Sequence, residues 1–271
     1  MTDETPTSTA PAVFAGLFAG KVALLTASTS GIGLATAQML AAAGARAVVI
    51  NGRNVAAGEA AAASIRARAP DTQVELAAGD VSVLDEARRV CETTLARHGR
   101  VDVFVHAAGG DISPRPFIEL DPAVYRPLID GHFTSLLNCC SVIAPAMAGQ
   151  QGGSIIAIAS DAGKIATPGE SIIGAMTAAV MMYVRTLALE LGRHGVRVNC
   201  ITPSLVTDTK AHDRVMSSEF SRKIFEKASR RARLGVPSPA DIAPLAVFLA
   251  SPLASHLTGQ AISVNGGISA A

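Results

Sequence analysis

Short, continuously apolar runs alternate along this chain with longer segments rich in helix-forming residues. "KVALLTAS" (residues 21–28) is apolar over the length of a strand, and "GIGLATAQMLAAAGA" (31–45) contains helix formers and closes at Gly44. "RAVVING" (46–52) is a second run of strand length. Together these segments predict a β-α-β unit.

The same alternation continues towards the C-terminus. It predicts further strands over 73–80, 101–110, 153–160, 196–204 and 259–267, and further helices over 61–70, 83–99, 128–147, 171–192 and 240–251. Strands that are apolar on both faces and separated by helices indicate a parallel sheet covered on both sides. No linker or repeat interrupts the pattern. We therefore expect the α/β class: a Rossmann-type three-layer fold with a doubly wound parallel sheet, in a single domain.

The polar, Thr- and Pro-rich start of the chain predicts a disordered arm over residues 1–17, followed by a domain over 18–271. It lacks the early positive charge of a secretory signal. The most apolar run, 172–184, is shorter than the roughly 20 residues that span a bilayer. We expect it to form a buried helix of a protein that contacts no membrane.

Composition narrows the class of ligand. Among 271 residues, 23 Lys and Arg are balanced by 22 Asp and Glu, and 49% of residues are hydrophobic. This balance predicts no nucleic-acid partner and favours a small-molecule ligand. The four cysteines form no C-x-x-C pair, and the histidines have no metal-ligand spacing. We expect reduced thiols, no metal site and a cytoplasmic location.

Open sheets of this type bind nucleotides beyond the carboxyl ends of their strands. "TASTSGIG" (26–33) lies there, after the first predicted strand, where glycines permit positive φ and close approach of the backbone to a pyrophosphate. The motif is short, and a glycine-bearing turn without a ligand is the alternative. Its placement in the first β-α-β unit favours a cofactor site formed by Thr26, Ser28, Ser30, Gly31, Ile32 and Gly33.

The residues after the second and third strands bear on the choice of cofactor. An acidic residue at the end of the second strand would bond to the ribose of NAD, whereas "VVINGRN" places Gly52 and Arg53 there. A cation at this point favours the 2′-phosphate of NADP over NAD, although a lone arginine is often only solvated. We expect Asp80 and Val81 to contact the adenine.

These stretches resemble the short-chain dehydrogenase/reductase family from about residue 21 to the C-terminus. The resemblance is carried by "TASTSGIG", "GDV", "HAAGG", "GSIIAIAS", "GVRVNCITPSLVTDT" and "RLGVPSPADIAPLAVFLASPLASHLTGQAISVNGG". It implies an NAD(P)-dependent oxidoreductase, a helical lid over 207–233 and a homo-oligomer, either a tetramer or a dimer. It also implies cofactor contacts from Ala108, Gly109, Pro203, Val206 and Thr207.

The sequence departs from the family at several positions. Ala27 replaces the first glycine, His106 and Ala107 replace two asparagines, and Ser204 follows Pro203 where glycine is usual. The small side chain of Ala27 is tolerable there at some cost in backbone energy.

The catalytic residues depart further. The family uses a tyrosine to carry a proton, a lysine four residues later, a serine that orients the carbonyl and an asparagine on the preceding helix. Ser160 matches the serine, but Ile173, Thr177 and His132 occupy the other three places. The chain has two tyrosines, and neither restores the pair: Tyr125 lies before the middle helix, and Tyr183 lies roughly 15 Å beyond Ile173 along its helix.

Three functions remain open. The first is an oxidoreductase of a small carbonyl or alcohol with a divergent mechanism, in which Ser160 and His132 are catalytic and Lys164, Asp161 and Glu170 lie nearby in sequence. The second is a catalytically silent nucleotide-binding partner or sensor. The third is a non-redox enzyme, such as a hydratase, isomerase, C–C lyase or hydrolase, with His106 or His132 as base. A hydrogen-bonded wall position is the alternative for His106.

Overall fold

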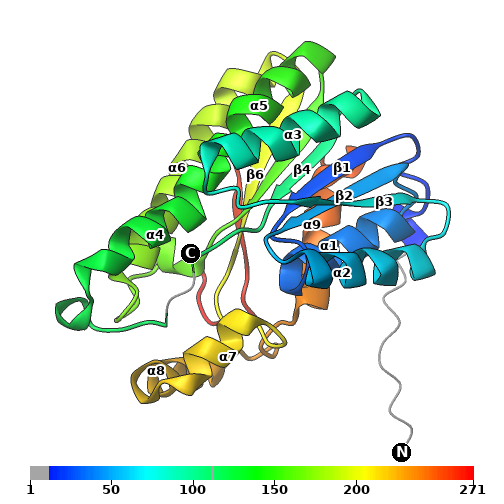
Figure 1. The fold of residues 1–271 in the computed structure, drawn as a ribbon. Coiled ribbons are helices and arrows are strands. Elements are labelled where there is room, and N and C mark those ends of the chain that lie inside the picture. The colour runs from blue at the N-terminus through cyan, green and yellow to red at the C-terminus, as the bar shows by residue number, and fades with distance from the viewer. Residues whose placement is uncertain (1–11, 111–112) are drawn as a thin grey trace, which may run out of the picture.

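A parallel β-sheet forms the centre of the protein. The computed structural model describes residues 12–110 and 113–271, and in them the sheet has seven strands in the order β3-β2-β1-β4-β5-β6-β7 (Figure 1). The strands are β1 (Val22–Thr26), β2 (Ala47–Gly52), β3 (Gln73–Ala78), β4 (Val103–His106), β5 (Gly153–Ile158), β6 (Val196–Pro203) and β7 (Ala261–Val264). The order reverses between β1 and β4, which confirms the predicted doubly wound α/β fold.

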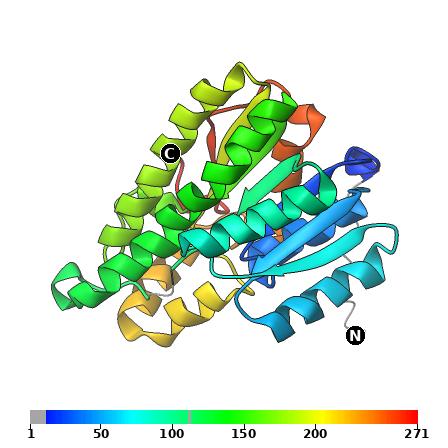
Figure 2. The ribbon, with the colours of Figure 1, turned by 45° about the horizontal axis from the view of Figure 1, so that its top comes forward.

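Helices cover both faces of this sheet. The helices and helical turns are η1 (Ala12–Phe14), α1 (Gly31–Ala42), α2 (Val55–Arg68), α3 (Leu84–His98), η2 (Phe117–Glu119), η3 (Pro122–Val124), α4 (Tyr125–Ile129), η4 (Asp130–Thr134), α5 (Ser135–Gln150), η5 (Asp161–Gly163), α6 (Ser171–Gly192), α7 (Lys210–Ser217), α8 (Glu219–Ser229), α9 (Pro239–Ala250) and η6 (Pro252–Ala254). α1, α2 and α9 cover one face, and α3, α5 and α6 cover the other (Figures 1 and 2).

The alternation of side chains along each strand divides the core between these two layers. On β1, Ala23 and Leu25 pack towards α1 and α9, whereas Leu24 packs towards α3 and α5. Residues on both faces of β1 are at most 1% exposed. Such burial on both faces explains why the strands are continuous apolar runs in the sequence.

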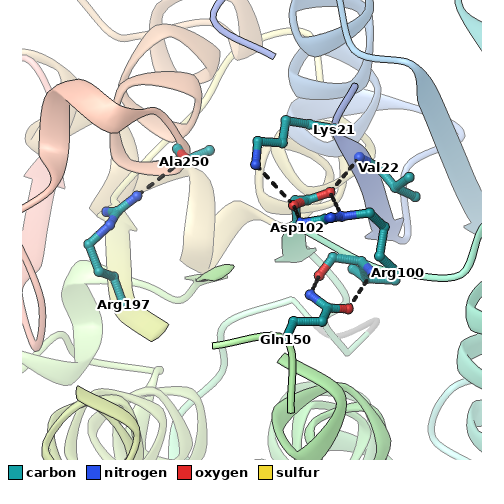
Figure 3. A network of polar contacts seen from close by, with 8 residues as sticks. Lys21, Val22, Arg100, Asp102, Gln150, Arg197 and Ala250 are labelled. Carbon is teal, nitrogen blue, oxygen red and sulfur yellow. Dashed lines mark hydrogen bonds and ion pairs between the residues drawn. The ribbon is translucent and has the colours of Figure 1, made fainter. Parts of the chain in front are cut away.

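A polar network ties the amino ends of β1 and β4 together, at the edge of the sheet opposite the carboxyl ends (Figure 3). Asp102 accepts hydrogen bonds from the Val22 amide at 3.0 Å, from Lys21 at 3.3 Å and from Arg100 at 2.9 and 2.6 Å. Burial acts to raise the pKa of Asp102, but the bond from Arg100 and its other partners hold that pKa below its ordinary value. The network therefore fixes the register of two central strands with an ionised carboxylate.

Residues 12–17, which the sequence predicts as part of a disordered arm, lie against the domain. They include η1, and Phe14 is 6% exposed against the α1 side of the core. The two phenylalanines of "AVFAGLF" account for this, because Phe18 is also buried. The remainder of the predicted arm, residues 1–11, lies outside the described residues.

α6 has the predicted length but is less enclosed than predicted. By length and composition alone it is apolar enough to cross a membrane. One face is buried through residues such as Met176, Val180 and Val184, while Met182 and Leu189 on the other face are 58% and 84% exposed. The helix is thus a core element with one apolar face open.

Candidate functional site

A cleft of about 930 Å³ opens at the carboxyl ends of the central strands. Its walls come from the turn after β1, the ends of β2 to β6, the η4 segment and the helix α7. This is where the strand order reverses, and it is the position in which an open parallel sheet presents a ligand site. The predicted lid region 207–233 contains α7 and α8, which lie together below this edge in Figure 1.

The glycine-bearing turn has the shape that a pyrophosphate site requires. Gly31 has a φ of +55°, and a Cβ on Gly33 would lie 2.7 Å from the Ala27 carbonyl oxygen. Ser30 is the N-cap of α1, yet its side chain makes no capping bond, so the first-turn amides of α1 line the cleft without it. Uncapped amides at a helix N-terminus bind phosphate groups well. The turn therefore fits a dinucleotide.

Ala27 has the unfavourable backbone conformation that the sequence predicts for it. Its φ is +48°, in the left-handed region that disfavours any residue with a Cβ. The departure from the family's glycine has thus preserved the shape of the turn with a strained residue.

Thr26 and Ser28 lie behind the cleft and do not line it. The Ser28 hydroxyl donates to the Leu25 carbonyl at 2.7 Å and accepts from the Asn51 amide at 3.0 Å, while Thr26 bonds to His106. Both side chains are fully buried. They support the turn, so their expected contact with a cofactor is indirect. Asn51, which sequence reasoning missed, joins them by donating to the carbonyl oxygens of Ala77 and Gly79.

Arg53 and Asp80 lie together in the cleft, beyond the ends of β2 and β3, where the sequence predicts the adenosine. Their side chains form an ion pair at 3.6 Å, and the Arg53 side chain is 70% exposed. Burial acts to raise the pKa of Asp80, but bonds with Ser82 and the charge of Arg53 lower it overall. The end of β2 carries no carboxylate of its own, and Val81 lines the cleft beside Asp80.

Most of the other residues predicted to bind the cofactor line the cleft. The cleft is lined by Ser30, Ile32, Ala108, Gly109, Pro203 and Val206 in addition to the residues above. Thr207 does not line it, because its amide donates to the Pro237 carbonyl at 2.9 Å and its hydroxyl bonds to Asp208.

Ser160 lines the cleft at the end of β5, and its hydroxyl accepts a hydrogen bond from the Ala162 amide at 3.2 Å. Ile173 lines the same cleft from the first turn of α6, whereas Thr177 is 1% exposed and bonds back to its own helix. An isoleucine and an inward-facing threonine supply no acid here. Tyr183 packs edge-on against Phe133 and Tyr125 stacks on Phe117, so neither takes over the position.

His132 lies in the cleft wall, on the π-helical turn η4. Its Nδ1 lies 2.8 Å from the Gly110 amide, which donates to it, and 3.1 Å from the Leu128 carbonyl oxygen. The same amide lies 3.3 Å from Nε2, so the imidazole is held against the backbone of Gly110. π-Helical turns often mark functional sites, and this one presents an imidazole to the cleft.

His106 is a wall residue. It is fully enclosed, with Nδ1 at 3.0 Å from the Thr26 hydroxyl and Nε2 at 3.1 Å from the Ser135 hydroxyl. Burial, reinforced by the charge of His132, lowers the pKa of His106 to about 3. A ring that is neutral at physiological pH and bonded at both nitrogens is poorly suited to act as a base.

Glu170 is the residue that sequence reasoning named only as a neighbour. It lines the cleft at the start of α6, and burial raises its pKa to about 7 against a lowering contribution from Thr167. The other two charged neighbours are committed elsewhere. Asp161 accepts bonds from Ser263, Asn265 and Ser269, and Lys164 donates to the Ala261 carbonyl and to Ser263.

The protein-family model described as enoyl-(acyl carrier protein) reductase matches residues 26–269 of this chain. The chain belongs to the short-chain dehydrogenase/reductase family, whose members are oxidoreductases. It is 32% identical to the 3-oxoacyl-(acyl-carrier-protein) reductase FabG of Chlamydia trachomatis over 255 residues, which is 93% of this chain and 99% of that protein.

Solved structures agree. A short-chain type dehydrogenase/reductase from Mycobacterium ulcerans superposes with a TM-score of 0.85 at 31% identity, covering 93% of this chain and 90% of that one. A gluconate 5-dehydrogenase from Burkholderia cenocepacia, solved in complex with NADP and tartrate, gives 0.84 at 26% identity, covering 94% and 96%.

Proposed function

We propose that the protein is an NAD(P)-dependent oxidoreductase that interconverts a small carbonyl compound and its alcohol without the family's tyrosine and lysine. The observation that carries this proposal is that the cleft combines an intact dinucleotide turn, at Gly31 and Gly33, with Ser160 at the end of β5. A bound nicotinamide would supply or accept hydride. The chain would hold the pyrophosphate on the amides of α1, and the Ser160 hydroxyl would bond to the substrate oxygen.

NADP is the proposed preference over NAD. Arg53 supports it, because its exposed guanidinium ends β2 where an acidic residue would be needed for the ribose of NAD. The existing pair with Asp80 would have to share Arg53 with a phosphate. Arg53→Ala is expected to weaken NADPH binding roughly tenfold and NADH binding much less. Arg88→Ala, on the exposed face of α3, is the matched control.

The first test is binding. A ligand at 100 times its dissociation constant adds about 2.7 kcal/mol to stability, so NADPH and NADH are compared by thermal unfolding. The second test measures turnover, as the change in nicotinamide absorbance with a panel of small ketones, aldehydes and 3-oxoacyl thioesters. Turnover without a change in that absorbance would instead indicate non-redox chemistry.

A catalytically silent partner or sensor is the second candidate. Ile173 in the cleft and Thr177 inside the helix favour it, because together they remove the usual proton carrier. Cofactor binding without turnover across the panel would establish it.

The protein is further proposed to act in the cytoplasm as a homo-oligomer on a small-molecule substrate. The exposed apolar residues Met182 and Leu189 on α6 support association between copies. Light scattering of the purified protein measures the size of the assembly.

A further inference from the structure

Glu170 occupies a position that helix capping does not explain. It is the N-cap residue of α6, yet its side chain makes no hydrogen bond to the helix amides. Within residues 12–110 and 113–271, its carboxylate also has no ion pair. A half-buried carboxyl group with neither kind of partner is costly to hold in its charged form.

The carboxyl group belongs to the same wall as the residues at the reaction centre. Glu170 is the N-cap residue of α6, three positions before Ile173 in the first turn of that helix. Both line the cleft together with Ser160. The side chain that the family would use as an acid has thus been replaced by an apolar one, and a carboxyl group lies three positions before it on the same wall.

The segment before Glu170 is enclosed by two distant parts of the chain. The Arg115 amide donates to the Gly169 carbonyl at 3.0 Å. A Cβ on Gly169 would lie 2.7 Å from Cε1 of Phe220, so the ring of this α8 residue packs directly against the turn. Burial is the main influence on the pKa of the neighbouring Glu170.

The elements packed against α6 carry Asp161 and Lys164 at η5, Asp130 and His132 on η4, and Tyr125 and Arg126 on α4. Arg115 lies beside Gly169, and α8, whose Phe220 covers that glycine, carries Glu219, Arg222, Lys223, Glu226 and Lys227. Glu219 and Lys223 pair with each other on α8 at 2.7 Å. Burial and Thr167, rather than these charges, set the protonation of Glu170.

We propose that Glu170 is the proton carrier that replaces the family's tyrosine; the assignment rests on the oxidoreductase function proposed above. In carbonyl reduction a bound nicotinamide would supply the hydride and be oxidised by two electrons; the hydride would form the C–H bond as the carbonyl π pair moves to oxygen. The Glu170 O–H bond then breaks and its proton forms the alcohol O–H bond. The carboxylate recovers a proton from water. Alcohol oxidation is the reverse, with the carboxylate as base.

The state of the carboxyl group suits this role. Its pKa of about 7 leaves comparable populations of acid and base near neutrality, which is the condition for efficient general catalysis. His132 is less well placed, because its ring is engaged by the backbone of Gly110 and Leu128. His132 then serves as a wall residue of the cleft.

Glu170→Gln tests the assignment, with Glu190→Gln on the exposed face of the same helix as the matched control. We expect Glu170→Gln to lower kcat at least about 100-fold, while the Kd for NADPH changes less than threefold. The inflection in kcat near pH 7 should disappear. Glu170→Asp should retain part of the activity, and Glu190→Gln should match the wild type in every respect. Thermal unfolding confirms that each variant is folded.

A direct readout does not depend on turnover. In infrared difference spectra between the wild type and Glu170→Gln, the carboxylic acid band should be present at pH 6 and replaced by a carboxylate band at pH 9. A carboxylate band already present at pH 6 would overturn the assignment.

The outcomes separate the two proposals. If NADPH binds and Glu170→Gln turns over like the wild type, the assignment fails and the oxidoreductase function stands. Loss of the pH 7 inflection in His132→Gln but not in Glu170→Gln would transfer the role to His132. If neither NADPH nor NADH binds, or if the wild type binds them without turnover, both proposals fail.

Discussion

The Thr177 hydroxyl donates to the Ile173 carbonyl oxygen at 2.7 Å, so the two residues that replace the family's catalytic pair bond to each other inside α6. This carbonyl is also the α-helical partner of the Thr177 amide, and the threonine side chain is 1% exposed. Thr177 therefore faces the core, where its side chain packs as a small buried residue.

Thr177→Val should accordingly be almost silent. The carbonyl keeps its amide partner and the volume is conserved, so the free energy of unfolding should change by less than about 1 kcal/mol. The Kd for NADPH should stay within twofold. Urea denaturation and fluorescence titration measure both quantities, and a tenfold weaker Kd would show that Thr177 contacts the ribose after all.

Ala27→Gly should stabilise the protein. Ala27 has a φ of +48°, and glycine removes a cost of about 1 kcal/mol in that region, partly offset by its greater freedom in the unfolded chain. We expect a gain of up to about 1 kcal/mol and tighter binding of NADPH. Gln151→Gly, at a φ of +54° at the end of α5, is the control. It should gain similar stability with no change in cofactor affinity, and a loss of stability in both variants would contradict the argument.

His106 should make the protein sensitive to acid. Its folded-state pKa of about 3 lies below the ordinary value of 6.5, so its contribution to stability is complete above pH 6.5 and is lost as pH falls towards 3. His106→Asn should flatten this part of the curve of unfolding free energy against pH. The same variant should cost about 1–3 kcal/mol at pH 8, because the hydroxyls of Thr26 and Ser135 each lose a partner.

Glu170 should make the protein less stable as the pH rises, which is the opposite of the effect of His106. Its folded-state pKa is raised from 4.5 to about 7, so the stability linked to its neutral form is complete below pH 4.5 and is lost as pH rises through 7. Glu170→Gln should be more stable than the wild type at pH 8 by no more than about 3 kcal/mol, and close to it at pH 4.5. An equal difference at both pH values would show that the carboxyl group is not held neutral.

Phe220→Ala should lower the pKa of Glu170 without touching the carboxyl group itself. The Phe220 ring covers Gly169, and its loss admits water to the turn that carries Glu170. The pKa of Glu170 should then fall towards its ordinary value, and the inflection in kcat should move to lower pH. Phe117→Ala, which removes an exposed ring elsewhere, should leave the inflection unchanged.

Patterns confined to one segment predicted the fold well. The predicted helix at 171–192 is α6 to the residue, and every predicted strand contains an observed one, because continuous apolar runs reflect burial on both faces. α2 was expected from residue 61 but begins at Val55. The glycine at position 58 made the first turns of α2 look non-helical in the sequence. A glycine is needed there because a Cβ would lie 2.5 Å from the Leu76 side chain.

The site was harder to predict, because its chemistry depends on contacts between distant segments. The glycine turn, Arg53 and Ser160 could be found from short motifs. The state of Glu170 could not, since it depends on enclosure by Arg115 and Phe220, which are about 50 residues away on either side. Likewise, the low pKa of His106 follows from its burial between Thr26 and Ser135. The one available signal for Glu170 was an acidic residue just before the helix that has lost its tyrosine.

The π-helical turn at Asp130–Thr134 is equivalent to one residue inserted into a regular α-helix. Shortening the chain by a single residue within it would let α4 and α5 merge into one uninterrupted cylinder. Because the wide turn absorbs the extra residue locally, the side chains beyond it would keep their faces, and only those within the turn would change direction. Here, the gain or loss of one codon could point the imidazole of His132 into the cleft or turn it away.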